Sequence, residues 1–286
     1  MSARRAVVDG GGTKCHWLVF GRGGECDFVT PGVNPLMLSA SQIVETWASA
    51  VADAGVGCVD EVYYYGAGCI GGEANEKIAD ALRRLTHCGH VAVESDILGA
   101  ARATLGREAG VACILGTGCN SCLYDGRAIV GNVRPLGYIL GDEGSGADIG
   151  KHIVADALKG LLDRRTTEAF FAFAGGDYAE IVRRVYSQPR ANAYLATFAQ
   201  FAAERNADPA IDAIVQERFR AFLRRNVLLY PAEGLTAGVS FVGGVASHFE
   251  ASLRRVCGEV GVGVRAVCAD PVGGLRRYHE QAVIAP

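Results

Sequence analysis

The chain has 286 residues, 50% of them hydrophobic, which is enough for one large domain or two of ordinary size with a sizeable core. Lys and Arg (28) nearly balance Asp and Glu (31), and the net charge of −3 offers no general attraction to nucleic acid or to an anionic membrane. No apolar run reaches the ~18 residues of a membrane span. We therefore expect no nucleic-acid partner and no membrane partner.

The ten cysteines do not by themselves indicate disulfides. The first five residues lead directly into a strand-like run, without the apolar stretch of a signal peptide. Most of the cysteines lie in apolar or strand-like contexts, where a free thiol behaves as a small hydrophobe. We expect reduced thiols and a cytoplasmic protein.

The first motif is a strand-like run, Val7 to Asp9, that ends in Gly10, Gly11, Gly12, Thr13 and Lys14. Its spacing fits neither a P-loop nor a dinucleotide-binding loop, because the glycines are consecutive and strand formers follow at residues 15–20. The glycines therefore join two strands. An ordinary hairpin turn explains them, and so does a turn whose backbone N–H groups approach a phosphate, with Asp9 beside the accompanying metal ion.

A turn signal at residues 32–35 precedes a helix that begins with the capping-box pattern Ser39-x-x-Gln42. Ile43, Trp47 and Val51 then recur at helical spacing, which predicts one buried face. Asn34 lies on the loop before this helix. Asn before Pro is typical of turns, but a loop at this position can also present its amide to a ligand.

The next elements alternate between strand and helix: a strand at 62–65, a helix at 73–85, a strand at 91–94 and a helix after residue 96. Asp96 therefore lies at the carboxyl end of a strand and the amino end of a helix. One interpretation is a helix N-cap, where Asp is favoured. The other is a carboxylate in the crevice where open α/β sheets bind ligands.

A second strand-turn-strand unit follows a hundred residues after the first. Strand residues 111–115 lead into Gly116, Thr117 and Gly118, and a second strand follows. The repetition predicts a duplicated fold in which each half lends a turn to one anion. Cys119-x-x-Cys122 has no second such pair, and alternate strand residues point to different faces, so we expect no metal or redox role for it.

The segment from Pro135 to Gly146 combines closely spaced glycines with adjacent carboxylates, Asp142 and Glu143, which predicts a ligand-facing loop. Residues 151–230 are helical with breaks at 175–176, 188–189 and 208–209. A strand at 239–242 then ends in Gly243 and Gly244 before a helix. A strand at 263–268 and a helix from Pro271 to Ile284 complete the chain.

Together, the hairpin of residues 9–14, Asp96, the hairpin of residues 116–121 and the strand-turn of residues 241–246 resemble the ordered motifs of the sugar kinase, heat-shock ATPase and actin superfamily. Within it, Gly-Val-Asn-Pro, Leu-Gly-Thr-Gly-x-Asn-Ser and Gly-Asp-Glu-Gly-Ser-Gly are most similar to the N-acetylglucosamine kinase branch of the BadF/BadG/BcrA/BcrD ATPase family. The resemblance covers nearly the whole chain. It implies an α/β fold of two ribonuclease-H-like lobes, with ATP and a sugar bound in the cleft between them.

The resemblance also implies roles for individual residues. Asp96 matches the catalytic base, and Asp9 matches the carboxylate on the Mg²⁺ side. Substrate binding is implied for Asn34, Asn120, Gly137 and Asp142. ATP binding is implied for Asp9, Gly10, Gly11, Gly12, Thr13, Lys14, Gly116, Thr117, Gly118, Gly243 and Gly244. Leu136 stands where vertebrate-type N-acetylglucosamine kinases have a tryptophan, which puts the preferred sugar substituent in doubt.

We expect an N-terminal lobe of residues 1–112, a C-terminal lobe of residues 113–270, and a C-terminal helix of residues 271–286 that packs back on the first lobe. The expected activity is ATP-dependent phosphorylation of the 6-OH of N-acetylglucosamine or a related N-acetylated hexosamine. Two alternatives are an ATPase that activates a partner enzyme, as in other members of the broad family, and a non-catalytic sugar-binding relative. A homodimer is compatible with the apolar surface of residues 151–230.

Overall fold

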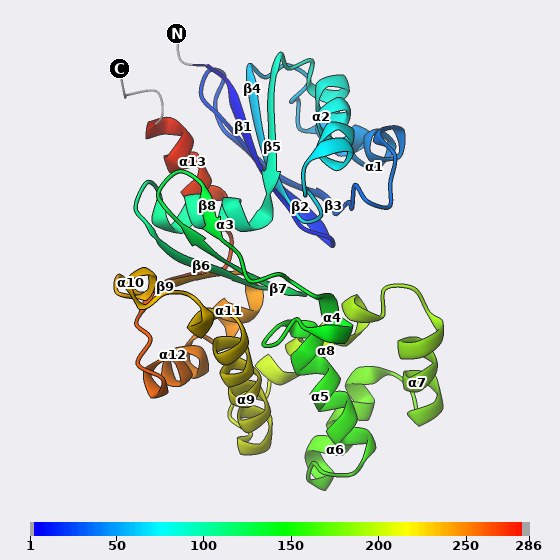
Figure 1. The fold of residues 1–286 in the computed structure, drawn as a ribbon. Coiled ribbons are helices and arrows are strands. Elements are labelled where there is room, and N and C mark those ends of the chain that lie inside the picture. The colour runs from blue at the N-terminus through cyan, green and yellow to red at the C-terminus, as the bar shows by residue number, and fades with distance from the viewer. Residues whose placement is uncertain (1–2, 282–286) are drawn as a thin grey trace. The chain divides into compact units, whose positions relative to one another are not determined.

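The computed structural model describes residues 3–281, which form two compact units (Figure 1). Unit 1 contains the chain up to Arg107 together with the segment from Pro271 onward, and unit 2 contains Glu108–Asp270. The division precedes strand β6 (Gly110–Leu115), whereas the expected boundary between residues 112 and 113 falls inside that strand. Residues 282–286 of the expected terminal helix lie outside the described part of the chain.

Each unit contains one five-stranded sheet, and the two sheets have the same connectivity. The order in unit 1 is β3 (Cys26–Pro31), β2 (Lys14–Phe20), β1 (Arg5–Gly10), β4 (Glu61–Gly66) and β5 (His90–Ser95). The order in unit 2 is β8 (Ile129–Gly131), β7 (Cys119–Tyr124), β6, β9 (Val239–Val242) and β10 (Val264–Cys268). In both sheets, the first three strands pair antiparallel to their neighbours. The last two strands run parallel to the central strand, which is β1 in unit 1 and β6 in unit 2. The predicted α/β fold with two ribonuclease-H-like halves is confirmed.

In unit 1, helices cover both faces of the sheet (Figure 1). Helices α1 (Ala40–Asp53) and α2 (Gly72–Thr86) bury Trp47 and Ile78 against one face. Helices α3 (Asp96–Leu105) and α13 (Val272–Gln281) pack on the other face, where Leu275 joins the strand residues. The predicted capping box is present at α1, since Ser39 and Gln42 bond reciprocally.

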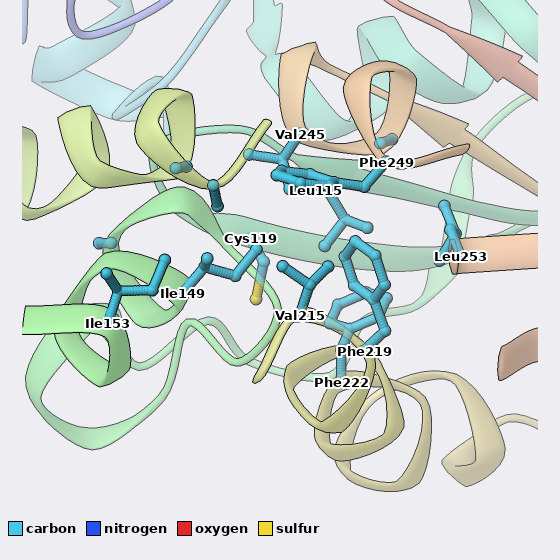
Figure 2. Packing of buried hydrophobic residues seen from close by; sticks show 14 of the residues in the cluster. Leu115, Cys119, Ile149, Ile153, Val215, Phe219, Phe222, Val245, Phe249 and Leu253 are labelled. Atoms are coloured by element: carbon cyan, nitrogen blue, oxygen red, sulfur yellow. The ribbon is translucent and has the colours of Figure 1, made fainter. Parts of the chain in front are cut away.

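Unit 2 carries a large helical core. Its helices are α4 (Gly137–Leu140), α5 (Gly146–Leu158), α6 (Arg164–Ala174), α7 (Tyr178–Ser187), α8 (Ala191–Ala203), α9 (Pro209–Arg225), the 3₁₀ turn η1 (Val227–Leu229), α10 (Ala232–Leu235), α11 (Gly244–His248) and α12 (Glu250–Glu259). The three predicted breaks separate α6 to α9, and a further break separates α5 from α6. Figure 2 shows Phe219 and Phe222 of α9 packed with Leu115 of β6 and Phe249. Full burial of such side chains stabilises the unit by about 1.5–3 kcal/mol each, so this core fixes the sheet that carries the loops described below.

Within residues 3–281, no helix combines the length and apolar character needed to cross a bilayer. All ten cysteines are free, and six of the most buried lie inside the two cores.

Candidate active site

The hairpin between β1 and β2 is tight and open to solvent at its tip. The Gly11 N–H donates to the Lys14 carbonyl at 2.9 Å, which leaves a two-residue loop of Gly12 and Thr13. Gly12, Thr13 and Lys14 are exposed. From the following loop, the Gly32 N–H donates to the Thr13 carbonyl at 3.0 Å. A side chain on Gly32 would collide with the backbone of this hairpin, so Gly32 is a further residue of the site that the sequence patterns did not reveal.

Gly10 and Gly12 of this hairpin differ in whether the fold requires a glycine at their position. A Cβ on Gly10 would overlap the ring of Tyr64, which is fully buried, so packing requires glycine there. A Cβ on Gly12 would meet no atom within 4 Å, and the backbone of Gly12 does not have a positive φ. Neither packing nor turn geometry therefore requires glycine at residue 12. A small residue there leaves room for a group that approaches the backbone from outside.

Asp9 and Asp96 lie at the same edge of the unit 1 sheet. Gly10, Gly66 and Ser95 are aligned across the parallel strands β1, β4 and β5, so the residues around them share the carboxyl-end edge. This is the edge at which open α/β sheets bind ligands. Asp9 immediately precedes Gly10 in β1, and Asp96 immediately follows Ser95.

The N-cap interpretation of Asp96 is wrong, because Ser95 occupies that position. The Ser95 Oγ accepts the Leu98 N–H at 3.4 Å, and Asp96 is the first residue of α3. The Asp96 Oδ1 accepts the N–H of Ile97 at 2.8 Å. Burial nevertheless raises the pKa of Asp96 above its ordinary value. A carboxylate with a raised pKa at a partly exposed edge position is suited to accept a proton from a ligand.

Asn34 forms the turn that the sequence suggested. Its Oδ1 accepts the Leu36 N–H at 3.0 Å, which is an Asx turn. The same oxygen lies against Gly68, on the turn that follows β4 at the site edge. Its amide nitrogen donates to no acceptor among residues 3–281 and is available to a ligand.

The hairpin between β6 and β7 is hydrogen-bonded to the start of α5. The Gly116 N–H donates to the Gly118 carbonyl at 3.0 Å. The first two N–H groups of α5, those of Gly146 and Ala147, donate to the carbonyls of Gly116 and Thr117 at 2.8 and 3.1 Å. Helix N–H groups that lack an intrahelical partner thus orient this loop. With the carbonyls turned toward α5, the loop is fixed more firmly than its counterpart in unit 1.

Asp142 lies directly beside this second hairpin. Its Oδ1 accepts the Cys119 N–H at 3.3 Å, and its carboxylate packs against Gly118. Its φ of 59° is unusual for a residue other than glycine. Burial raises the pKa of Asp142, and the neighbouring charge of Glu143 adds to the shift. The structure thus brings Asp142 and the predicted phosphate hairpin together.

The turn after β9 meets the same hairpin. The Gly243 N–H donates to the Cys268 carbonyl at 2.8 Å, and a side chain on Gly243 would collide with the Leu115 carbonyl. Gly243 also has a φ of 119°, which strongly favours glycine. A Cβ on Gly244 would meet nothing within 4 Å. Gly243 is therefore required by the fold, and Gly244 leaves open space beside it.

Two predicted sugar residues of unit 2 differ in their surroundings. Asn120, on β7, is held by hydrogen bonds to Ser121 and Asn132. Gly137 is the exposed first residue of α4, next to the exposed side chains of Leu136, Ile139 and Leu140. The predicted loop of residues 135–146 therefore contains one short helix.

The donor set fits a magnesium ion that arrives with a nucleotide. Among residues 3–281, no group of three or more His, Cys, Asp or Glu side chains could hold a metal ion. Mg²⁺ usually keeps several waters and binds one or two carboxylates plus the phosphates of its substrate. A single carboxylate beside an open glycine hairpin, as at Asp9, matches that requirement.

Comparisons with known proteins agree with this geometry. A provisionally assigned N-acetylglucosamine kinase from Porphyromonas gingivalis is 40% identical, covers 96% of this chain and 98% of its own, and superposes with a TM-score of 0.91. A second protein of that description, from Chromobacterium violaceum, shares the fold at 21% identity, covers 95% and 97% of the two chains, and has a TM-score of 0.70.

More distant kinases share the fold as well. A ROK family glucokinase from Streptomyces griseus, bound to glucose and AMPPNP, is 18% identical, covers 95% of each chain and has a TM-score of 0.58. No curated protein matches this chain. The profile of the BadF/BadG/BcrA/BcrD ATPase family matches residues 8–264, and the chain belongs to that family.

Proposed function

We propose that this chain is an ATP-dependent amino-sugar kinase that phosphorylates the 6-OH of N-acetylglucosamine or a related N-acetylated hexosamine. The observation that carries the proposal is the repeated hairpin: each unit places a glycine turn at the carboxyl edge of its sheet, with Asp9 directly before the first turn and the Asp142 carboxylate against the second. The 40% identical relative, whose provisional name is N-acetylglucosamine kinase, supports the choice of substrate class.

The nucleotide would contact glycine turns. Gly10–Lys14 and Gly116–Gly118 would receive the phosphates, and Gly243 and Gly244 would face the nucleoside. Asp9 would hold Mg²⁺, which would neutralise charge on the phosphates when bound. Phosphoryl transfer needs positioning and charge stabilisation more than covalent chemistry from the protein, and backbone N–H groups with one metal carboxylate supply both.

Asp96 would act on the sugar. Its carboxylate accepts the proton of the sugar hydroxyl while the hydroxyl oxygen bonds to the γ-phosphorus and the bond from that phosphorus to ADP breaks. Asn34, Asn120, Asp142 and Gly137 would hold the other sugar groups. The free cysteines are consistent with a reducing compartment such as the cytoplasm.

An ADP-release assay across N-acetylglucosamine, glucosamine, N-acetylmuramate, N-acetylmannosamine and glucose tests the proposal. We expect ADP release that depends on an N-acetylated hexosamine and on Mg²⁺. ADP release without any sugar dependence, together with stoichiometric iron in the purified protein, would instead favour an activator ATPase. Absence of ADP release with every sugar would favour a non-catalytic sugar-binding protein.

A further inference from the structure

Asn120 shows the donor side of its amide to any ligand, because its oxygen is already used. The Asn120 Oδ1 accepts the Ser121 N–H at 2.9 Å and the Asn132 Nδ2 at 3.1 Å. A backbone N–H can only donate, so the oxygen of Asn120 must face it. Among residues 3–281, Nδ2 of Asn120 donates to no acceptor.

The amide of Asn132 is fixed by the same reasoning. Its Nδ2 donates to the Ser121 carbonyl at 2.5 Å as well as to the Asn120 Oδ1. A carbonyl can only accept, so the nitrogen of Asn132 must face it, and both of its hydrogens are used. The N–H of Ser121 thus orients the side-chain amide of Asn120, and the C=O of Ser121 orients that of Asn132.

The backbone on both sides of Asn132 is also held. Gly131 pairs with Leu123 in the β7–β8 ladder. The Val133 N–H donates to the hydroxyl of Tyr230 at 3.0 Å, and this hydroxyl is also 2.8 Å from the Ser121 Oγ. Asn132 therefore keeps its position although its own side chain is exposed.

We propose that Asn132 is a positioning residue that presets Asn120 as a hydrogen-bond donor, and that it thereby selects sugars with a neutral acceptor group at that position over sugars with a free ammonium. An N-acyl carbonyl or a hydroxyl oxygen accepts a hydrogen bond from the Asn120 Nδ2. A protonated amine has donors and no acceptor, so it would leave two donors facing each other. This inference rests on the proposed sugar kinase function and adds a residue outside the proposed sugar contacts that would set the selection of N-acylated sugars over free amino sugars.

The substitution Asn132→Asp tests the inference directly. A carboxylate at residue 132 has no hydrogen to donate, and it repels the Asn120 oxygen. A charge-assisted hydrogen bond from the Asn120 Nδ2 to this carboxylate is stronger than the neutral bond from the Ser121 N–H to Oδ1, so the amide of Asn120 turns its nitrogen toward Asp and its oxygen toward the ligand, and the bond from Ser121 is lost. We expect the ratio of kcat/KM for N-acetylglucosamine to kcat/KM for glucosamine to fall by about 10- to 100-fold, mostly through KM, since a hydrogen bond to a charged group contributes about 1.5–3 kcal/mol.

Two further variants separate positioning from general damage. Asn206→Asp makes the same charge change at an exposed asparagine of the same unit, and we expect it to leave the ratio unchanged. Asn132→Ser retains a donor at residue 132, and we expect its ratio to stay nearer to the wild type than that of Asn132→Asp. Thermal melting confirms that each variant is folded, and if Asn132→Asp is not, Asn132→Ala replaces it, with a smaller fall of the ratio expected because the Ser121 N–H still faces the Asn120 Oδ1.

The outcomes distinguish the inference from the function on which it rests. Suppose that the wild type phosphorylates N-acetylglucosamine and that a folded Asn132 variant keeps its N-acetylglucosamine to glucosamine ratio of kcat/KM within twofold of the wild type. This result would overturn the inference and leave the kinase assignment intact. A wild-type preference for glucosamine would overturn it in the same way. A wild-type protein that phosphorylates no sugar would overturn both.

Discussion

The two glycine hairpins have the same place in two sheets of the same topology, yet they are supported differently. The hairpin of unit 1 has an exposed two-residue tip, and the Gly32 N–H bonds to one of its carbonyls. The hairpin of unit 2 is bonded by the start of α5, contacted by Asp142 and adjoined by Gly243. Duplication explains their common position. The difference indicates that unit 1 keeps an exposed loop at the sheet edge that also carries the proposed base, whereas unit 2 provides a preorganised loop with a proposed binding residue, Asp142, held against it.

The strongest test of this comparison is Asp96→Asn, which changes the carboxylate of unit 1 without changing its size. We expect the rate of phosphorylation to fall by roughly two to four orders of magnitude, since that is the usual contribution of a general base. ATP binding should remain, because the Asp96 carboxylate bonds to Ile97 of its own helix and is not among the residues proposed to hold the nucleotide. Single-turnover kinetics and nucleotide titration measure the two quantities, and near-normal turnover would contradict the assignment of the base.

The pH dependence of kcat/KM provides a second measure of the same carboxylate. Burial raises the pKa of Asp96, and the base acts only when it is deprotonated. Activity should therefore be lost as the pH falls through a value above the ordinary ~3.9 of aspartate. A pH–rate profile of the wild type should show this acid limb, and the residual activity of Asp96→Asn should lack it.

In unit 2, Asp142→Asn should affect binding more than chemistry. We expect the KM for the sugar to rise about 10- to 100-fold, the effect of losing a charge-assisted hydrogen bond, with a smaller change in kcat. Steady-state kinetics of Asp96→Asn and Asp142→Asn, measured in parallel, test whether one carboxylate serves mainly chemistry and the other mainly binding. If Asp142→Asn lowers kcat as much as Asp96→Asn does and leaves KM unchanged, the two units do not differ in the way proposed.

Each unit also offers a matched pair of glycines, one required by the fold and one that borders open space. Gly10→Ala and Gly243→Ala should each lower the free energy of unfolding by about 1–3 kcal/mol through overpacking or a strained φ. Gly12→Ala and Gly244→Ala should change it by less than about 0.5 kcal/mol. Urea denaturation measures these values.

Gly12 and Gly244, whose substitution should change stability least, should matter for nucleotide binding. Gly12→Ala and Gly244→Ala should reduce the increase in melting temperature that ADP produces, because the added methyl group occupies space that the nucleotide would use. An unchanged ADP-induced shift in both variants would mean that these turns do not face the nucleotide.

Much of the fold was predictable because its signals are local. Periodic apolar residues indicated the helices, and the capping box at Ser39 fixed the start of α1. Strand β8 has only three residues and gave no pattern, and β3 joins the sheet through its pairing with β2. The cap of α3 belongs to Ser95 rather than Asp96, because both residues suit an N-cap and a shift of one residue in the strand end decides between them.

The candidate site was proposed from a set of motifs, and the contacts that support those motifs could not be predicted. Gly32 and Asn132 act through hydrogen bonds to residues 11 or more positions away, and no local pattern specifies such pairs. The distinction between Gly10 and Gly12 depends on where the ring of Tyr64 lies, which is a property of tertiary packing. Sequence reasoning therefore proposed the chemical groups, and only the structure separates those that the fold requires from those that border open space.

The smallest expected effect concerns the loop that carries Asp142. Arg225 Nε lies 2.6 Å from the Glu143 Oε1, but the Arg225 side chain is 63% exposed. Exposed ion pairs contribute about 0–1 kcal/mol, so Arg225→Ala should change both the unfolding free energy and the KM for the sugar only slightly. If Arg225→Ala raises KM as strongly as Asp142→Asn does, this ion pair holds the loop, and the preorganisation of unit 2 depends on its surface rather than on α5.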